Sequence, residues 1–126
     1  MGPRIIVVHY DPEFLVGAAQ MLQQAGFEVA AFENSLAAWD AVKQPGLEML
    51  ITKVRVPDGQ PNGVALAQMA LQYQRALKVI FLSSDPRDSD FTNGLGISLS
   101  MPLQPAAMAA YAARMMGKPP PEGLAA

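Results

Sequence analysis

The chain has 126 residues, 51% of them hydrophobic and 16% charged, which is typical of a single globular domain with a buried core. A net charge of −2 favours neither nucleic acid nor an anionic membrane as a partner. With no cysteine and one histidine, His9, the chain cannot form disulfides, thiol catalysts or zinc sites built from cysteine or several histidines.

No apolar run reaches the roughly 18 residues that a membrane-spanning helix needs. The start of the chain carries only four apolar residues in succession, Ile5–Val8, which is shorter than the apolar region of a signal peptide. We therefore expect a cytoplasmic protein.

Short apolar runs alternate with segments of helical periodicity along the chain. The run Ile5–Val8 predicts a strand buried on both faces, and Asp11 followed by Pro12 predicts the start of a helix. Strands are expected over residues 5–8, 27–31, 49–54, 79–82 and about 97–99. Helices are expected from Pro12 to about Gly26, from Ser35 to about Pro45, from Asn62 to about Tyr73 and from Pro105 to about Met116.

Five strand–helix pairs in strict alternation predict an α/β fold, with a five-stranded parallel sheet covered by helices on both faces. The fourth helix is expected to be shortened, because Phe91 and Leu95 are the main apolar side chains between the fourth and fifth strands. One domain is expected over residues 1–116, followed by a flexible proline-rich tail over 117–126. In such sheets the functional crevice lies beyond the carboxyl ends of the strands.

Four segments, in the right order and at compatible spacing, resemble the receiver domain of bacterial response regulators (the CheY-like superfamily). They are Ile5–Pro12, Met49–Gly59, Val79–Ser84 and Ser100–Leu103, and the resemblance covers about residues 4–116. It implies a single-domain flavodoxin-like (βα)5 three-layer sandwich, and a role in a two-component or phosphorelay system. The implied partners are signalling proteins: a histidine kinase, a phosphotransfer protein or an output protein. A monomer or weak homodimer is expected.

The resemblance also implies that the phosphorylation site is degenerate. The positions of the family's acidic pair hold His9 and Tyr10, with Asp11 adjacent, and the phosphoacceptor position holds Lys53. Lysine cannot form the acyl phosphate that an aspartate forms, and magnesium prefers oxygen ligands, usually carboxylates. We therefore predict a pseudo-receiver that is not phosphorylated and carries no metal and no cofactor. No pattern of catalytic residues is present, so we do not expect an enzyme.

The resemblance assigns three further positions to the family's switch. Ser83 keeps the hydroxyl that contacts the phosphoryl group, whereas Ser98 replaces the switch aromatic and Met101 replaces the lysine. An element with only one state cannot transmit a signal by a population shift. The sequence therefore favours a domain that acts through protein–protein contacts in one fixed conformation.

Three roles remain open for Lys53. It could form an ion pair with Asp11 or Asp58 that replaces the metal, bind an anion together with Ser83, or point into solvent. His9 could act as a pH switch or be a hydrogen-bonded structural residue. The alternative function is accordingly a small-anion or ligand-sensing domain that uses the crevice of Lys53, Ser83 and His9.

Overall fold

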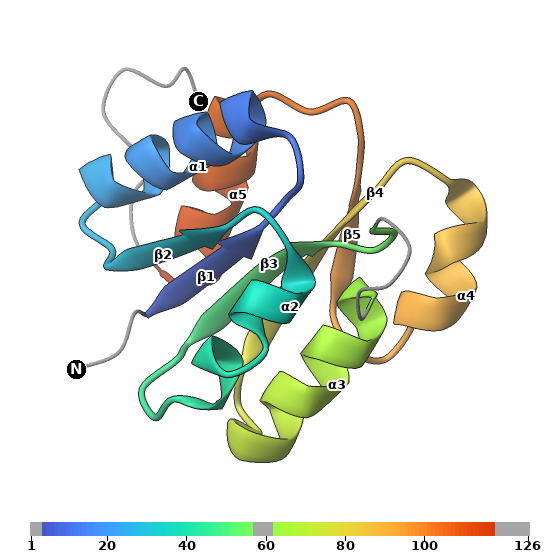
Figure 1. The fold of residues 1–126 in the computed structure, drawn as a ribbon. Coiled ribbons are helices and arrows are strands. Elements are labelled where there is room, and N and C mark those ends of the chain that lie inside the picture. Colours follow the sequence, from blue (N-terminus) through green and yellow to red (C-terminus); the bar gives the residue numbers. More distant parts are fainter. Residues whose placement is uncertain (1–3, 57–61, 118–126) are drawn as a thin grey trace.

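A five-stranded parallel sheet forms the centre of the computed structural model, which describes residues 4–56 and 62–117 (Figure 1). The strand order is β2-β1-β3-β4-β5, and all neighbouring strands are parallel. The strands are β1 (Ile5–Val8), β2 (Val29–Phe32), β3 (Met49–Lys53), β4 (Lys78–Ser83) and β5 (Ile97–Ser100). The predicted flavodoxin-like α/β sandwich is confirmed.

Helices cover both faces of this sheet. As Figure 1 shows, α1 and α5 pack together on one face, while α2 and α3 lie on the other. The helices are α1 (Pro12–Gln24), α2 (Ser35–Ala38), α3 (Gly63–Tyr73), α4 (Ser89–Thr92) and α5 (Pro105–Met115), with 3-10 turns η1 (Ala41–Lys43) and η2 (Pro86–Asp88). Within the described residues, none of these helices has the length and apolar character needed to cross a membrane.

Alternate residues of the central strands pack into two separate hydrophobic cores, one on each face of the sheet. In β1, Ile5 and Val7 pack in the cluster beneath α1 and α5, whereas Ile6 and Val8 pack in the cluster beneath α2 and α3. All four are essentially inaccessible to solvent. Because both faces are buried, the strand is apolar at every position rather than at alternate ones, which is why it could be recognised in the sequence.

Two helices differ from a simple βα repeat. The second helix was expected to reach about Pro45, but α2 ends at Ala38, and the chain continues through 3-10 hydrogen bonds such as Lys43 N–H to the Asp40 carbonyl. This tightened path still buries Ala38 and Val42. The fourth helix is short as expected, with one 3-10 turn followed by the four residues of α4.

Caps and a close backbone contact fix the helices against the carboxyl edge of the sheet. Asp11 caps α1 by accepting from the Glu13 N–H, and Asn62 caps α3 by accepting from the Ala65 N–H. Gly63, the first residue of α3, lies so near the carbonyl of Lys53 that a Cβ atom would overlap it. The first turn of α3 is thereby held directly against the end of β3.

Candidate functional site

Lys53 lies at the centre of the carboxyl edge of the sheet. It is the last residue of β3, and only 6% of its surface is exposed. Its Nζ donates a hydrogen bond to Ser84 Oγ at 2.6 Å and lies 5.9 Å from the centre of the Tyr10 ring. Burial lowers the pKa of Lys53, and the carboxylate of Asp88 opposes this shift. The end of β3, where the resemblance predicts the phosphoacceptor, therefore holds a partly desolvated cation.

The predicted ion pair of Lys53 with Asp11 is not formed, whereas the alternative pair with Asp58 stays a prediction. Among residues 4–56 and 62–117, no ion pair joins Lys53 to Asp11, whose carboxylate instead accepts from the Glu13 backbone N–H at 3.1 Å. Asp11 is one position beyond the acidic pair, and there its side chain serves as the cap of α1. Asp58 lies outside the described residues.

His9 is buried at the end of β1, with 5% of its surface exposed. Its Nδ1 accepts from the Asp11 backbone N–H at 3.0 Å, so the proton of the neutral ring is on Nε2. Nε2 is buried and has no hydrogen-bond partner among the described residues. Burial and the charge of Lys53 lower the pKa of His9, while Asp11 opposes them. The imidazole is therefore neutral near pH 7, and it packs against Phe14 and Tyr10.

The hydroxyl of Ser83 belongs to a different network from that of Lys53. Ser83 Oγ lies 2.7 Å from Asp88 Oδ2 and 2.8 Å from the Asp85 carbonyl oxygen, two acceptors for its single proton. The neighbouring Ser84, not Ser83, contacts Lys53. The structure therefore does not bring Lys53 and Ser83 together, as the predicted anion site would require. Successive residues at the end of a strand point in different directions, so a shift of one residue changes the partner.

Asp88 is the buried centre of this network. It is 1% exposed, and its Oδ1 accepts from Arg55 Nε at 2.8 Å while its Oδ2 contacts Ser83. We call Ser83, Arg55 and Asp88 the Asp88 clasp. It joins the end of β4 and the η2 turn to the residues that follow β3. Asp88 and Arg55 were not predicted from the sequence, although the close spacing of Asp85, Arg87 and Asp88 was an available signal.

An exposed ion pair flanks the clasp. Arg87 donates to both carboxylate oxygens of Asp85, at 3.1 Å to Oδ1 and 2.6 Å to Oδ2, and the Arg55 guanidinium lies 3.6 Å from the same carboxylate. The hydrogen bonds from Arg87 hold the pKa of Asp85 far below its usual range. Both carboxylates at the end of β4 are therefore already neutralised by arginines.

The remaining switch positions line a small pocket beside β5. Ser98 Oγ lies 3.0 Å from Thr92 Oγ1, and the Met101 backbone N–H donates to the Ser83 carbonyl at 2.7 Å. The pocket has a volume of about 240 Å³. It is lined by Ser83, Ser84, Asp85, Pro86, Ser89, Ser98, Ser100 and Met101. Ser98, which the resemblance predicts to replace the family's switch aromatic, thus lines an open pocket.

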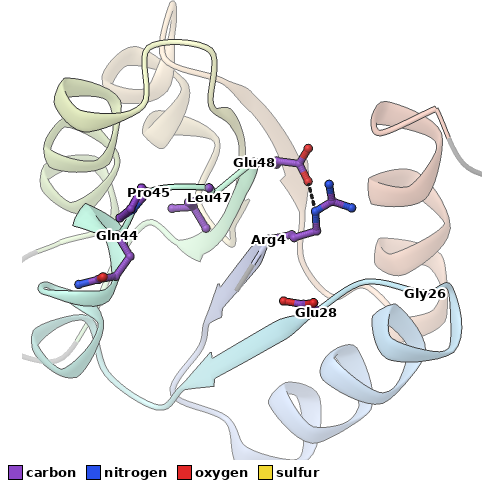
Figure 2. Close-up of a pocket in the computed structure, with 8 residues that line it drawn as sticks. Arg4, Gly26, Glu28, Gln44, Pro45, Leu47 and Glu48 are labelled. Carbon is purple, nitrogen blue, oxygen red and sulfur yellow. Dashed lines mark ion pairs between the residues drawn. The ribbon is translucent and has the colours of Figure 1, made fainter. Parts of the chain in front are cut away.

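A second hollow lies at the opposite, amino-terminal edge of the sheet (Figure 2). It has a volume of about 1010 Å³ and is bordered by charged side chains, including Glu28 and the ion pair of Arg4 with Glu48, whose Nε–Oε2 distance is 2.8 Å. None of the candidate site residues predicted from the sequence lines it. Within the described part of the chain, no group of three or more histidines and acids is placed to hold a metal ion.

Comparison with known proteins identifies the family. A model of the response regulator receiver domain matches residues 5–103. The chain is 25% identical over 80 residues to the response regulator receiver protein CpdR of Brucella abortus (strain 2308), covering 64% of this chain and 65% of that protein. It is 35% identical over 77 residues to the transcriptional regulatory protein CreB of Escherichia coli (strain K12), covering 61% and 33%. The matched region thus spans less than two thirds of either relative.

Solved structures show the same fold. A CheY-like response regulator receiver domain protein from Methanospirillum hungatei JF-1 superposes with a TM-score of 0.79 at 18% identity, covering 93% of this chain and 95% of that one. A receiver protein from Sinorhizobium medicae WSM419 gives 0.78 at 18% identity, covering 90% and 93%. The chain therefore belongs to the response regulator receiver domain family, the CheY-like receivers of two-component signalling systems.

Proposed function

We propose that this chain is a pseudo-receiver: a receiver domain that takes part in two-component signalling without being phosphorylated. The observation that carries the proposal is the buried ammonium of Lys53 at the phosphoacceptor position, hydrogen-bonded to Ser84. A carboxylate nucleophile is required to form an aspartyl phosphate, and an ammonium group cannot replace it.

The surroundings of Lys53 also disfavour the magnesium ion that phosphotransfer requires. His9 and Tyr10 stand at the acidic-pair positions, and neither is a hard oxygen ligand of the carboxylate type. A divalent cation a few ångströms from Lys53 would be repelled by roughly a few kcal/mol at an effective dielectric near 20. Nucleophile and metal site are thus lost together.

The Asp88 clasp supports a single fixed conformation. Ser83 is the one switch residue that keeps its chemistry, and its hydroxyl is already held by the buried carboxylate of Asp88. The clasp supplies an internal anion where a phosphorylated receiver would supply a phosphoryl group. Without two states of different affinity, a receiver presents the same surface to its partners at all times.

On this proposal the domain acts in the cytoplasm by protein–protein contact. It docks a histidine kinase, a phosphotransfer protein or an output protein as an adaptor or decoy, and it functions as a monomer or weak homodimer. Its net charge of −2 gives no electrostatic support for nucleic acid as a partner. We assign it no enzymatic reaction.

Capture of partners from a lysate of the source cells tests this role. The immobilised protein is incubated with lysate in the presence and absence of acetyl phosphate and Mg²⁺. The same signalling proteins are expected under both conditions, and the same set with Lys53→Ala. A partner that binds only after treatment with acetyl phosphate and Mg²⁺ would contradict the proposal.

A second candidate is a small-anion or ligand sensor in the same crevice. The observation that favours it is that two buried nitrogen donors, Nζ of Lys53 and Nε2 of His9, lack an anionic partner among the described residues. Thermal-shift measurements with phosphate, nucleotides and carboxylates distinguish the two functions. Stabilisation that Lys53→Ala abolishes supports the sensor, and no shift with any of these ligands supports the adaptor.

A further inference from the structure

The turn between α4 and β5 places an asparagine and a glycine next to each other on the surface. Asn93 has φ −59° and ψ 129°, and Gly94 has φ +83°. The Leu95 N–H donates to the Thr92 carbonyl at 3.0 Å across these two residues. Together the angles and the hydrogen bond define a type II turn, whose third residue needs a positive φ and is therefore usually glycine.

The side-chain amide of Asn93 and the backbone amide of Gly94 are both free. The hydrogen bond that closes the turn uses the N–H of Leu95, and within residues 4–56 and 62–117 the Gly94 N–H has no hydrogen-bond partner. The side-chain amide of Asn93 has none among these residues either. Both residues are exposed, and a Cβ atom at Gly94 would meet nothing within 4 Å beyond its neighbours in the chain. Solvent therefore reaches both amides.

The same pair of residues occurs a second time, at Asn62 and Gly63, where both amides are held. Asn62 Oδ1 accepts from the Ala65 N–H at 2.8 Å as the cap of α3. The Gly63 N–H donates to the Val54 carbonyl at 2.9 Å, and Gly63 is buried. Asn34, the remaining asparagine of the chain, is the cap of α2. Within the described residues, only Asn93 thus combines a free carboxamide with a following glycine.

We propose that Asn93 is a site of spontaneous deamidation in the folded protein, with water as the second reactant. Asparagine is a chemically labile residue. The Gly94 nitrogen loses its proton to solvent and attacks Cγ of Asn93, so that a C–N bond forms. The bond from Cγ to Nδ2 breaks, and this nitrogen takes up a proton and leaves as ammonia. Water then opens the resulting succinimide at either carbonyl, which gives aspartate or isoaspartate.

Either product changes the surface between α4 and β5. Both carry a new carboxylate, so the net charge of −2 becomes more negative by one unit. Isoaspartate also adds a methylene group to the main chain of the turn. This lengthening acts on Leu95, which packs against the core beneath α2 and α3, and on the hydroxyl contact of Thr92 with Ser98 across the turn. The inference is independent of the proposed signalling function.

Incubation of the full chain in mildly alkaline buffer, followed by protease digestion and peptide mass spectrometry, tests this site. In the folded chain Asn93 should deamidate at least about tenfold faster than Asn62, because two hydrogen bonds must break before Gly63 can attack. In guanidinium chloride, where the chain is unfolded, the two sites should react at similar rates. Asn93→Gln removes the five-membered ring of the intermediate, and this variant should show no reaction in the turn.

The comparison of folded with unfolded chain separates the effect of the structure from that of the sequence. Equal rates at Asn62 and Asn93 in the folded chain would show that the turn does not select the site. A folded chain in which Asn93 is as unreactive as Asn62, while both react in guanidinium chloride, would show that the turn protects it. Each of these two results would overturn the inference and leave the pseudo-receiver proposal unaffected.

Discussion

Lys53 and His9 place nitrogen-bearing side chains at the positions where the resemblance to receivers predicts carboxylates. Both are buried, and burial lowers the pKa of each. A protonated His9 would place a second cation near Lys53, which is why the charge of Lys53 also lowers the pKa of His9. The crevice is therefore more stable with a neutral imidazole than with a charged one.

The lowered pKa of His9 makes the free energy of unfolding depend on pH. Because its pKa in the folded state is lowered below about 6.5, the unfolded chain takes up a proton before the folded chain does. The free energy of unfolding should therefore fall as the pH drops below about 6.5, with a slope from this residue of at most about 1.4 kcal/mol per pH unit. Above about pH 6.5 the contribution of His9 to the free energy of unfolding is fully present.

Urea unfolding of wild type and His9→Asn between about pH 8 and about pH 5 measures this effect. The amide oxygen of asparagine can still accept from the Asp11 N–H, and the variant cannot titrate. The acid-side loss of stability should be smaller in His9→Asn than in wild type. Parallel pH profiles for the two proteins would show that His9 is not the responsible group.

Which of the adjacent residues Ser83 and Ser84 contacts Lys53 could not be predicted from the sequence. The resemblance predicted Lys53 as the substituted phosphoacceptor, because Lys53 lies within the matching segment Met49–Gly59. It could not decide whether Ser83 or Ser84 faces Lys53, since that depends on how the last residues of β4 turn. The partner of Ser83, Asp88, lies in a segment recognised only as polar and short.

The Asp88 clasp acts between elements. Arg55 follows β3, Ser83 ends β4, and Asp88 ends η2, so the three side chains link loops that are 33 residues apart in the sequence at their widest. In this chain the buried carboxylate of Asp88 bridges these loops. A hydrogen bond to a buried charged group contributes about 1.5–3 kcal/mol.

Removing this carboxylate should destabilise the fold. Asp88→Ala leaves Arg55 and Ser83 without their common acceptor, and the free energy of unfolding should fall by about 2–3 kcal/mol. Asp90→Ala, two residues further along on the exposed surface, is the matched control and should change stability by less than about 0.5 kcal/mol. Urea unfolding at pH 7 provides both values, and equal effects would mean that the clasp contributes nothing.

The contact of Gly63 with Lys53 is a second link between elements. Gly63 does not need the left-handed region of backbone space, so alanine would normally favour the helix at this position. Here a Cβ atom would overlap the Lys53 carbonyl. Gly63→Ala should therefore lower the free energy of unfolding by about 1–3 kcal/mol, as overpacking does.

Gln68→Ala, on the exposed face of the same helix, is the control for helix propensity and should be close to neutral or slightly stabilising. If Gly63→Ala proved as stable as Gln68→Ala in urea unfolding, α3 would not be fixed against the end of β3 by this contact.

Across the whole molecule, the sheet and the helices that cover it could be predicted from the sequence, whereas the side-chain contacts that join the loops could not. Parallel strands buried on both faces appear in the sequence as short apolar runs, and the caps Asp11 and Asn62 mark where α1 and α3 begin. The end of α2 was not predictable, because Trp39 and Val42 keep helical spacing although the chain follows 3-10 turns. The clasp depends on tertiary distances, which periodicity does not encode.

Restoring a single residue should not restore the function of the whole site. Lys53→Asp reintroduces a nucleophile, but His9 and Tyr10 still replace the acids that hold magnesium. We expect Lys53→Asp to remain unlabelled by acetyl phosphate, and the triple variant Lys53→Asp, His9→Asp, Tyr10→Asp to bind Mg²⁺. NMR titration with Mg²⁺ checks the second point, and circular dichroism checks that each variant folds. Phosphorylation of Lys53→Asp alone would show that the metal site is not lost.

The central claim is that this receiver is not phosphorylated. Its most direct test is intact-protein mass spectrometry after incubation of the wild-type chain with acetyl phosphate and Mg²⁺, with a phosphorylatable receiver treated in parallel. We expect the mass of this chain to stay unchanged while the reference receiver gains a phosphoryl group. A phosphoryl adduct on an aspartate of this chain would contradict it.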